Sequence, residues 1–239
     1  MDAQRIEAHS PEHYLAEKPV YPTGENRESA RNFRMQLRRL EQLSALSEDS
    51  LPDTLLLPLH LLPEYEKSRY SAWFSPEQVL LVPPRFVCDE DDLTSRLQAA
   101  QSHGFTSLAC GTVGDLMLCK ELHFSLPGTL GLHVTNHAAC AYLRDFGIAD
   151  VLLSPEIPQL PKPAPALPLG VFAYGRLPLM LTRNCPIQHQ VGCGKCRHTL
   201  TDRKGAAFYT DCTQFTDSPD YAELFNPAPV WLADKPEQY

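Results

Sequence analysis

Short apolar runs and helical stretches alternate along the chain from about residue 54 onward. The runs are continuous, as in strands of a parallel sheet that is buried on both faces. They predict strands at 54–59, 79–82, 106–110, 130–134, 151–153 and 171–174. Helical spacing and stop signals predict helices between them, at 90–103, 114–122 and 137–146. Strands and helices in this order indicate βαβ units and an α/β fold.

The number of strands limits how far the sheet can close. About six strands are predicted, whereas a closed (β/α) barrel needs eight. The first 50 residues offer no strand candidate, because 1–28 is polar and aperiodic and 31–46 has helical spacing through Phe33, Leu37, Leu40 and Leu43. We therefore expect an incomplete or modified TIM-like (β/α) barrel. Its parts are a polar arm and helix at 1–50, a partial barrel at 51–176, and a cysteine-rich, cluster-binding segment at 177–239 packed on the barrel.

Composition and charge narrow the range of partners. About 43% of the residues are apolar, which allows a substantial core, and the formal net charge is −8. Such a chain does not attract nucleic acid through its overall field, so RNA would need a local basic patch. No apolar run approaches the roughly 20 residues that cross a bilayer, and the N-terminus lacks a secretory signal. We expect a cytoplasmic protein with reduced thiols and no membrane contact.

Four of the eight cysteines follow one another with the spacing C-x7-C-x2-C-x15-C; they are Cys185, Cys193, Cys196 and Cys212. A C-x2-C pair places two sulfurs on one tight turn, and Gly194 gives that turn its freedom. Four thiolates suit either a tetrahedral zinc ion or a [4Fe–4S] cluster. Unligated thiols at a sharp turn are the remaining alternative.

The charges around these cysteines are mostly positive. Asp202 is the only acid in a window whose cations are Arg183, Lys195, Arg197, Arg203 and Lys204. Cations stabilise an anionic four-thiolate cluster, although a zinc tetrathiolate is anionic too. The other cysteines lie among apolar neighbours and are predicted to fill the core; they are Cys88, Cys110, Cys119 and Cys140.

The carboxyl ends of the predicted strands are the second place to look for a site, because α/β barrels assemble their sites there. The candidates are Asn136, Glu156, Tyr174 and Arg176. Three of them have a structural alternative: Asn136 can cap a helix, Glu156 can form a surface ion pair, and Arg176 can bind the cysteine loop. The sequence has no G-x-S-x-G elbow, no H-E-x-x-H helix and no phosphate-binding glycine loop, so local motifs do not build a conventional hydrolase.

Three segments together resemble the collagenase-like peptidase family U thirty-two: GLHVTNHAACAYLRDFGIADVLLSPEI, YGRLPLMLTRNCPI and LTDRKGAAFY. In that family one strand ends in an asparagine-containing turn and the next ends in S-P-E. A G-R-x-P-L segment then leads to a cluster-binding cysteine. These features fall here on Asn136, Glu156, Arg176 and Cys185, and the resemblance covers residues 54–235.

The resemblance implies a barrel-like fold with a four-iron cluster on four cysteines. It also implies oxygen-independent hydroxylation of RNA bases or of a small aromatic acceptor, with Arg176 and Glu156 as candidates for orienting a substrate or moving a proton. Asn136 and Tyr174 are candidates for binding that substrate. The alternatives are a collagenase-like peptidase and a non-catalytic assembly or RNA-binding module that uses the metal as a staple.

The chain departs from the family pattern in two ways. Some relatives carry an extra cysteine seven residues before the one that matches Cys185, where this chain has Pro178, so we choose Cys212 as the fourth ligand. The front of the barrel is also missing or unrecognisable. Larger relatives contain a second barrel-like portion near their C-terminus, and this chain resembles such a portion. Its partner would then be the missing barrel half or another family member.

Overall fold

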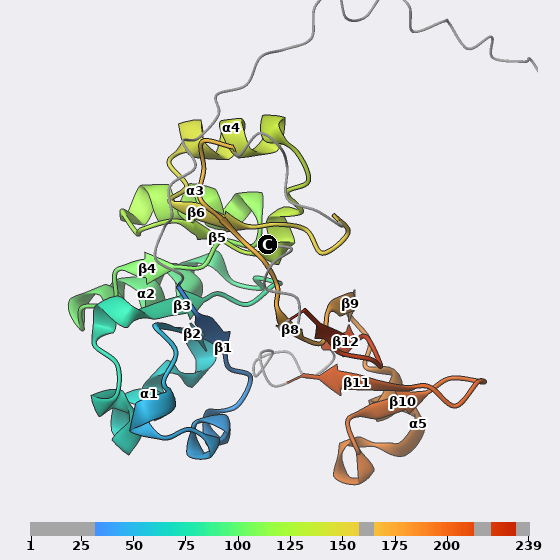
Figure 1. Cartoon of the computed structure of the whole chain (residues 1–239). Coiled ribbons are helices and arrows are strands. Elements are labelled where there is room, and N and C mark those ends of the chain that lie inside the picture. The colour runs from blue at the N-terminus through green and yellow to red at the C-terminus, as the bar shows by residue number, and fades with distance from the viewer. Residues whose placement is uncertain (1–31, 158–164, 213–220, 233–239) are drawn as a thin grey trace, which may run out of the picture.

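The computed structural model describes residues 32–157, 165–212 and 221–232, and its main parts are a curved parallel sheet with helices and a smaller antiparallel sheet (Figure 1). The fold is therefore mixed α/β with parallel sheets. The parallel strands occur in chain order, and their bounds are β1 Arg34–Gln36, β2 Thr54–Pro58, β3 Val79–Val82, β4 Ser107–Leu108, β5 Pro127–Gly128, β6 Asp150–Leu152 and β7 Leu169–Gly170.

Two groups of these strands join into one arc. Strands β1 to β4 pair in order, as do β5 to β7. Parallel bridges between Ser107 and Ser125 and between Cys110 and Gly128 connect the groups. The Cys110 N–H donates to the Pro127 carbonyl at 2.8 Å. Within the described residues no pairing joins β1 to β7, so the arc is not a closed barrel.

Helices cover one face of the arc, and their bounds are α1 Leu62–Lys67, α2 Glu90–Ser102, α3 Val113–Leu122 and α4 His137–Phe146. Strand residues alternate between the two faces. Leu55 and Leu81 face the helices in the large core, whereas Leu56 and Leu80 form a small cluster on the concave face. None of the helices in the described residues is both long and apolar enough to cross a bilayer.

Side-chain caps fix where three of these helices begin. The Asp89 carboxylate accepts from the Asp92 N–H, the Thr112 hydroxyl oxygen from Asp115 and the Asn136 amide oxygen from Ala139. Each cap satisfies an N–H that the helix itself leaves unpaired. Gly147 ends α4 with a φ of 107°, as predicted from the sequence. Short 3₁₀ turns connect the remaining elements, at Glu48–Ser50, Leu59–Leu61, Arg69–Ala72 and Pro76–Gln78.

The predicted helix at 31–46 is wrong. Its first part is strand β1, which pairs in parallel with β2 in a register that places Met35 beside Leu55. Only Leu40–Ala45 is helical, as the 3₁₀ helix η2. Phe33 is 62% exposed, whereas Leu37 and Leu43 are buried. Pairing with a sheet edge overrides a weak helical spacing. The prediction that no strand precedes residue 50 is therefore wrong as well.

Two other predicted strands are displaced. At 130–134 the chain forms the 3₁₀ turn η7, Leu130–Leu132, and only Val134 pairs with the sheet. A side chain at Gly131 would place its Cβ 2.3 Å from the Gly111 carbonyl oxygen, so the turn requires glycine. The strand predicted at 171–174 is replaced by β7 and by β8, Tyr174–Gly175, which pairs outside the arc with β13, Val230–Trp231.

An ion pair crosses the concave face of the arc. Arg34 on β1 donates to both carboxylate oxygens of Asp150 on β6, at 2.7 and 2.6 Å. Both side chains are less than a third exposed. A bidentate pair restrains orientation as well as distance. The first and sixth strands are thus held together although no backbone pairing joins them.

The C-terminal part is an antiparallel sheet with strand order β10-β11-β12-β9. It lies beside the arc (Figure 1), and its elements are β9 Pro178–Thr182, β10 Thr199–Thr201, β11 Ala207–Asp211, β12 Ala222–Phe225 and the short helix α5 Pro186–Val191. Arg176 anchors the chain before β9 by donating to the carbonyl oxygens of Asn226 and Pro227. This sheet corresponds to much of the segment predicted at 177–239.

One core residue gives a prediction about stability and pH. Tyr65 is 2% exposed, its hydroxyl has no hydrogen-bond partner among the described residues, and burial raises its pKa to about 12. Removing an unsatisfied buried hydroxyl removes a desolvation cost, so Tyr65→Phe should raise the free energy of unfolding by about 1 kcal/mol at neutral pH.

The same substitution should change how stability depends on pH. An unfolded tyrosine ionises near pH 10, below the folded pKa, so the wild type loses stability as pH rises through 10. The variant lacks this loss, and its advantage should grow by about 1.4 kcal/mol between pH 9 and pH 11. Urea denaturation at both pH values measures the difference. An advantage that stays constant would contradict the assigned burial.

Candidate metal centre and an adjoining charge cluster

The four C-terminal cysteines lie at the ends of short elements. Cys185 is the residue before α5, and Cys193 opens the 3₁₀ turn η8, Cys193–Lys195. Cys196 follows that turn, and Cys212 follows β11. Only Cys185 is buried; Cys193 is exposed, and the other two are half-buried.

The C-x2-C segment forms a tight turn with a sulfur-directed hydrogen bond. The Cys196 N–H donates to the Cys193 carbonyl at 3.1 Å. The His198 N–H then donates to the Cys196 Sγ at 3.3 Å, with His198 in the left-handed region at a φ of 53°. Gly192, at a φ of 74°, lets the chain leave α5. Backbone donors aimed at sulfur tune metal-bound thiolates, so this turn suits a ligand pair.

The cysteines converge on one side of the antiparallel sheet. Cys185, Cys196 and Cys212 belong to one apolar cluster, together with Ile187, Leu200 and Ala222. Burial raises the pKa of the Cys212 thiol, and charge on Asp211 and on each of the other three cysteines raises it further. Three of the four cysteines thus share one cluster, and four thiolates are by their chemistry the ligands of a zinc ion or an iron–sulfur cluster. In the part of the chain that the structure covers, no three Cys, His, Asp or Glu side chains meet closely enough to hold a single metal ion.

The predicted cations around the cysteines are exposed: Arg183, Lys195, Arg197, Arg203 and Lys204. Asp202 instead has a local structural role in the turn between β10 and β11. Its carboxylate accepts from the N–H groups of Lys204 at 2.8 Å and Ala206 at 2.9 Å. The cations can therefore approach an anionic group at this surface, because the one acid in the window is occupied by the backbone.

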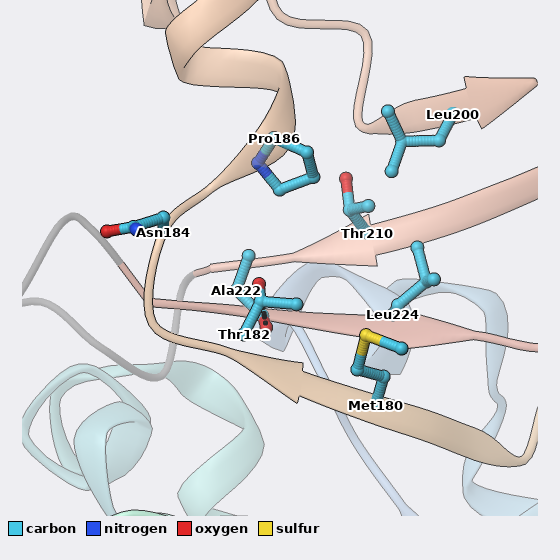
Figure 2. A pocket seen from close by; sticks show the side chains of 8 residues that line it. All are labelled: Met180, Thr182, Asn184, Pro186, Leu200, Thr210, Ala222 and Leu224. Atoms are coloured by element: carbon cyan, nitrogen blue, oxygen red, sulfur yellow. Dashed lines mark hydrogen bonds between the residues drawn. The ribbon is translucent and has the colours of Figure 1, made fainter.

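A pocket of about 250 Å³ lies on the same face of the sheet as the cysteine cluster. Figure 2 shows the side chains that line this pocket. Asn184 and Pro186, the residues on either side of Cys185, line one side of it. The four strands supply the rest of the lining, namely Met180, Thr182, Leu200, Thr210, Ala222 and Leu224. Leu200 and Ala222 are shared between the pocket and the cysteine cluster.

The opposite face of the sheet carries two buried acids, Asp211 on β11 and Glu223 on β12, which are paired in register. Arg38, after β1, donates to both, at 3.4 and 3.3 Å, and Arg85, after β3, donates to Glu223 at 2.5 Å. We call these four residues the charge cluster. The arginines follow the carboxyl ends of parallel strands, so the charge cluster attaches the antiparallel sheet to that end of the arc.

Aromatic and apolar contacts reinforce this attachment. The Arg38 guanidinium lies 3.8 Å from the centre of the Phe225 ring, and Phe86 stacks on Tyr221 with ring centres 4.7 Å apart. His60, in the turn after β2, adds a half-buried imidazole. Burial lowers its pKa against an opposing effect of Asp211, and its Nε2 has no hydrogen-bond partner among the described residues. A neutral imidazole therefore stands beside the charge cluster.

The four strand-end residues predicted as site residues make local structural contacts. Asn136 caps α4, with its amide oxygen 2.9 Å from the Ala139 N–H. Glu156 is exposed, and its N–H donates to the Ser154 hydroxyl. Tyr174 is 61% exposed and packs edge-on against Trp231, and Arg176 holds two backbone carbonyls. These contacts are those of capping and anchoring residues, and no described contact links the four residues to one another.

Sequence reasoning missed the charge cluster. A signal was present, because FYTDC and YAELF each place one acid within an apolar segment, at Asp211 and Glu223. An acid there has to be paired once the strand is buried. The two arginines follow strands, but the first strand was predicted as helix, so Arg38 was not at a predicted strand end.

The cysteines predicted to fill the core divide into two kinds. Cys110, Cys119 and Cys140 are buried, and the Cys110 and Cys119 sulfurs lie 3.3 Å apart. Cys88 is exposed in the segment before α2, so its assignment to the core is wrong.

Comparison with known proteins gives no relative: no protein-family model, no curated protein and no solved structure matches the chain.

The charge cluster leads to a prediction about how much the Glu223 carboxylate contributes to the stability of the protein. Glu223→Gln keeps the side-chain size but removes the charge that pairs with both arginines. It should lower the free energy of unfolding by about 1–3 kcal/mol, as measured by urea denaturation.

The matched control is Glu66→Gln, which breaks the exposed Glu66–His103 pair and should cost at most about 0.5 kcal/mol. If both variants lost the same free energy of unfolding, the buried Glu223 ion pairs would be no more stabilising than an exposed pair, which would contradict the prediction.

Proposed function

We propose that this chain is an iron–sulfur protein of the kind found in the collagenase-like peptidase family U thirty-two, with one [4Fe–4S] cluster on Cys185, Cys193, Cys196 and Cys212. The placement of Cys185, Cys196 and Cys212 in one apolar cluster, with Cys193 three residues before Cys196, supports the proposal. When bound, the cluster would supply one-electron transfer.

The family resemblance favours a cluster over a lone zinc ion, because four thiolates by themselves suit either centre. The exposed cations around the site would offset part of the cluster's negative charge.

The chain's own residues would control protonation and access. Cysteine binds metal as the thiolate, so Cys212, whose pKa is raised by burial, would lose its proton on binding. The His198 N–H would remain on the Cys196 sulfur. Ile187, Leu200 and Ala222 would exclude water from one side of the centre.

Oxygen-independent hydroxylation is the reaction that the family resemblance favours, on an RNA base or a small aromatic acceptor; a co-substrate other than O2 would supply the oxygen atom and be reduced by two electrons. The net charge of −8 weighs against RNA, and the apolar pocket beside the cysteines supports the small acceptor. Mass spectrometry of RNA nucleosides and small aromatic metabolites, from anaerobic cells with and without the chain, tests this part. The expected difference is a species that carries one added oxygen atom; identical profiles would contradict it.

The cluster itself is tested by anaerobic purification with iron, sulfide and zinc analysis and visible absorption. We expect a brown protein with about four iron and four sulfide per chain. A colourless protein with one zinc and no sulfide would refute the proposal.

Two exposed cysteines provide the matched comparison. Cys193→Ser should lose most of the iron and the visible absorption, whereas Cys88→Ser, which alters a cysteine outside the set, should keep both. Loss in both variants would indicate non-specific iron binding by exposed thiols.

A further inference from the structure

Two buried cysteines outside the C-terminal set have their sulfur atoms in contact. Cys110 follows β4, Cys119 lies on α3, and the side chains of both are inaccessible to solvent. Their Sγ atoms are 3.3 Å apart, and the Cys110 thiol is also 3.5 Å from the Leu108 carbonyl oxygen. Cys140 is buried in the same core, but within the described residues it makes no hydrogen bond to another thiol. Cys110 and Cys119 therefore form a dithiol rather than two separate core residues.

The backbone holds both members of this dithiol in place. The Cys110 N–H donates to the Pro127 carbonyl, and the Cys110 carbonyl accepts from the Thr129 N–H, both at 2.8 Å. The Cys119 carbonyl accepts from the Phe124 N–H at 2.9 Å, where α3 ends. None of these bonds uses a sulfur atom, so the two side chains can rotate while the backbone keeps its pairing. The sulfurs would have to approach by about 1.2 Å to reach the bond length of a disulfide, which is about 2.05 Å.

The surroundings of the dithiol keep it protonated. The hydrogen bond with Cys110 raises the pKa of the Cys119 thiol, and burial and the nearby Asp115 carboxylate raise it further. Asp115 is itself held by the N–H groups of Gly111 and Thr112, each at 2.8 Å. Thiols react with oxidants as thiolates, so this pair reacts slowly at neutral pH and faster as the pH rises. Burial also admits a small neutral oxidant more readily than a bulky disulfide.

We propose that Cys110 and Cys119 are a modification site, at which hydrogen peroxide converts the two thiols into a disulfide within the folded chain. One sulfur attacks a peroxide oxygen and becomes a sulfenic acid, and the first water leaves. The other sulfur then attacks the sulfenic sulfur, which forms the S–S bond and releases the second water. The two thiols lose two electrons and two protons, and one peroxide becomes two waters. This site does not depend on the proposed iron–sulfur function.

The disulfide would tie α3 to the point where the two groups of strands meet. Cys110 forms the parallel bridge to Gly128 that connects these groups. A bond to Cys119 would close the loop of residues 110–119 and restrict the unfolded chain. The oxidised protein should therefore melt about 5 °C above the reduced protein.

The site is tested by peptide mapping of the full chain after treatment with hydrogen peroxide under native conditions. Trypsin places both cysteines, and no other cysteine, in the peptide 97–120. After alkylation of the remaining thiols in denaturant, this peptide should carry no alkyl group and lack two hydrogen atoms, and dithiothreitol should reverse the change. Alkylation of both Cys110 and Cys119 in a sample whose exposed Cys88 has been oxidised would overturn the proposal.

Two buried helical cysteines supply the variant and its control. Cys119→Ala should leave Cys110 without a partner and abolish the rise in melting temperature on oxidation. Cys140→Ala, which removes a buried thiol from α4, should keep both the modified peptide and the rise. An equal rise in Cys119→Ala and wild type would assign the stabilisation to other thiols and contradict the proposed bond. The mapping of the wild type decides the proposal even where a variant does not fold.

Discussion

Two carboxylates that cannot stay unpaired determine how the two halves of the structure meet. Asp211 and Glu223 are almost completely buried, and an unpaired buried carboxylate costs several kcal/mol. Their partners Arg38 and Arg85 follow the first and third strands of the arc. The antiparallel sheet is thereby fixed at the carboxyl end of the parallel strands, which is where α/β barrels assemble their sites.

That attachment leaves the other face of the sheet available for the cysteines and the pocket. Neighbouring residues of a strand point to opposite faces. Asp211 therefore belongs to the charge cluster on one face, and Cys212 lies with the other cysteines on the opposite face. The cysteine centre is thus supported by the arc without containing any residue of it. The Arg34–Asp150 pair stiffens the arc itself, whose strands do not close into a barrel within the described residues.

The sequence predicted some elements well and others poorly, for physical reasons. The long periodic helices, such as α4 with its Asn136 cap and Gly147 stop, and the buried strands β2 and β3 follow from local patterns. Strand β1 does not follow from a local pattern, because its structure comes from pairing with β2, which is distant from it in the sequence. The cysteine spacing predicts a shared centre, and only the fold brings Cys212 into the apolar cluster of Cys185 and Cys196. The charge cluster depends on four residues from distant segments, so no local pattern could assemble it.

The alternation along β11 has a consequence for how this chain can vary in evolution. An insertion or deletion of one residue within the strand would exchange its faces, turning Asp211 toward the thiols and Cys212 toward the arginines. The turn around Asp202, by contrast, can change length without affecting either face. Homologous chains should therefore differ in the length of the β10–β11 turn. The residues that correspond to Asp211 and Cys212 should remain adjacent in the sequence.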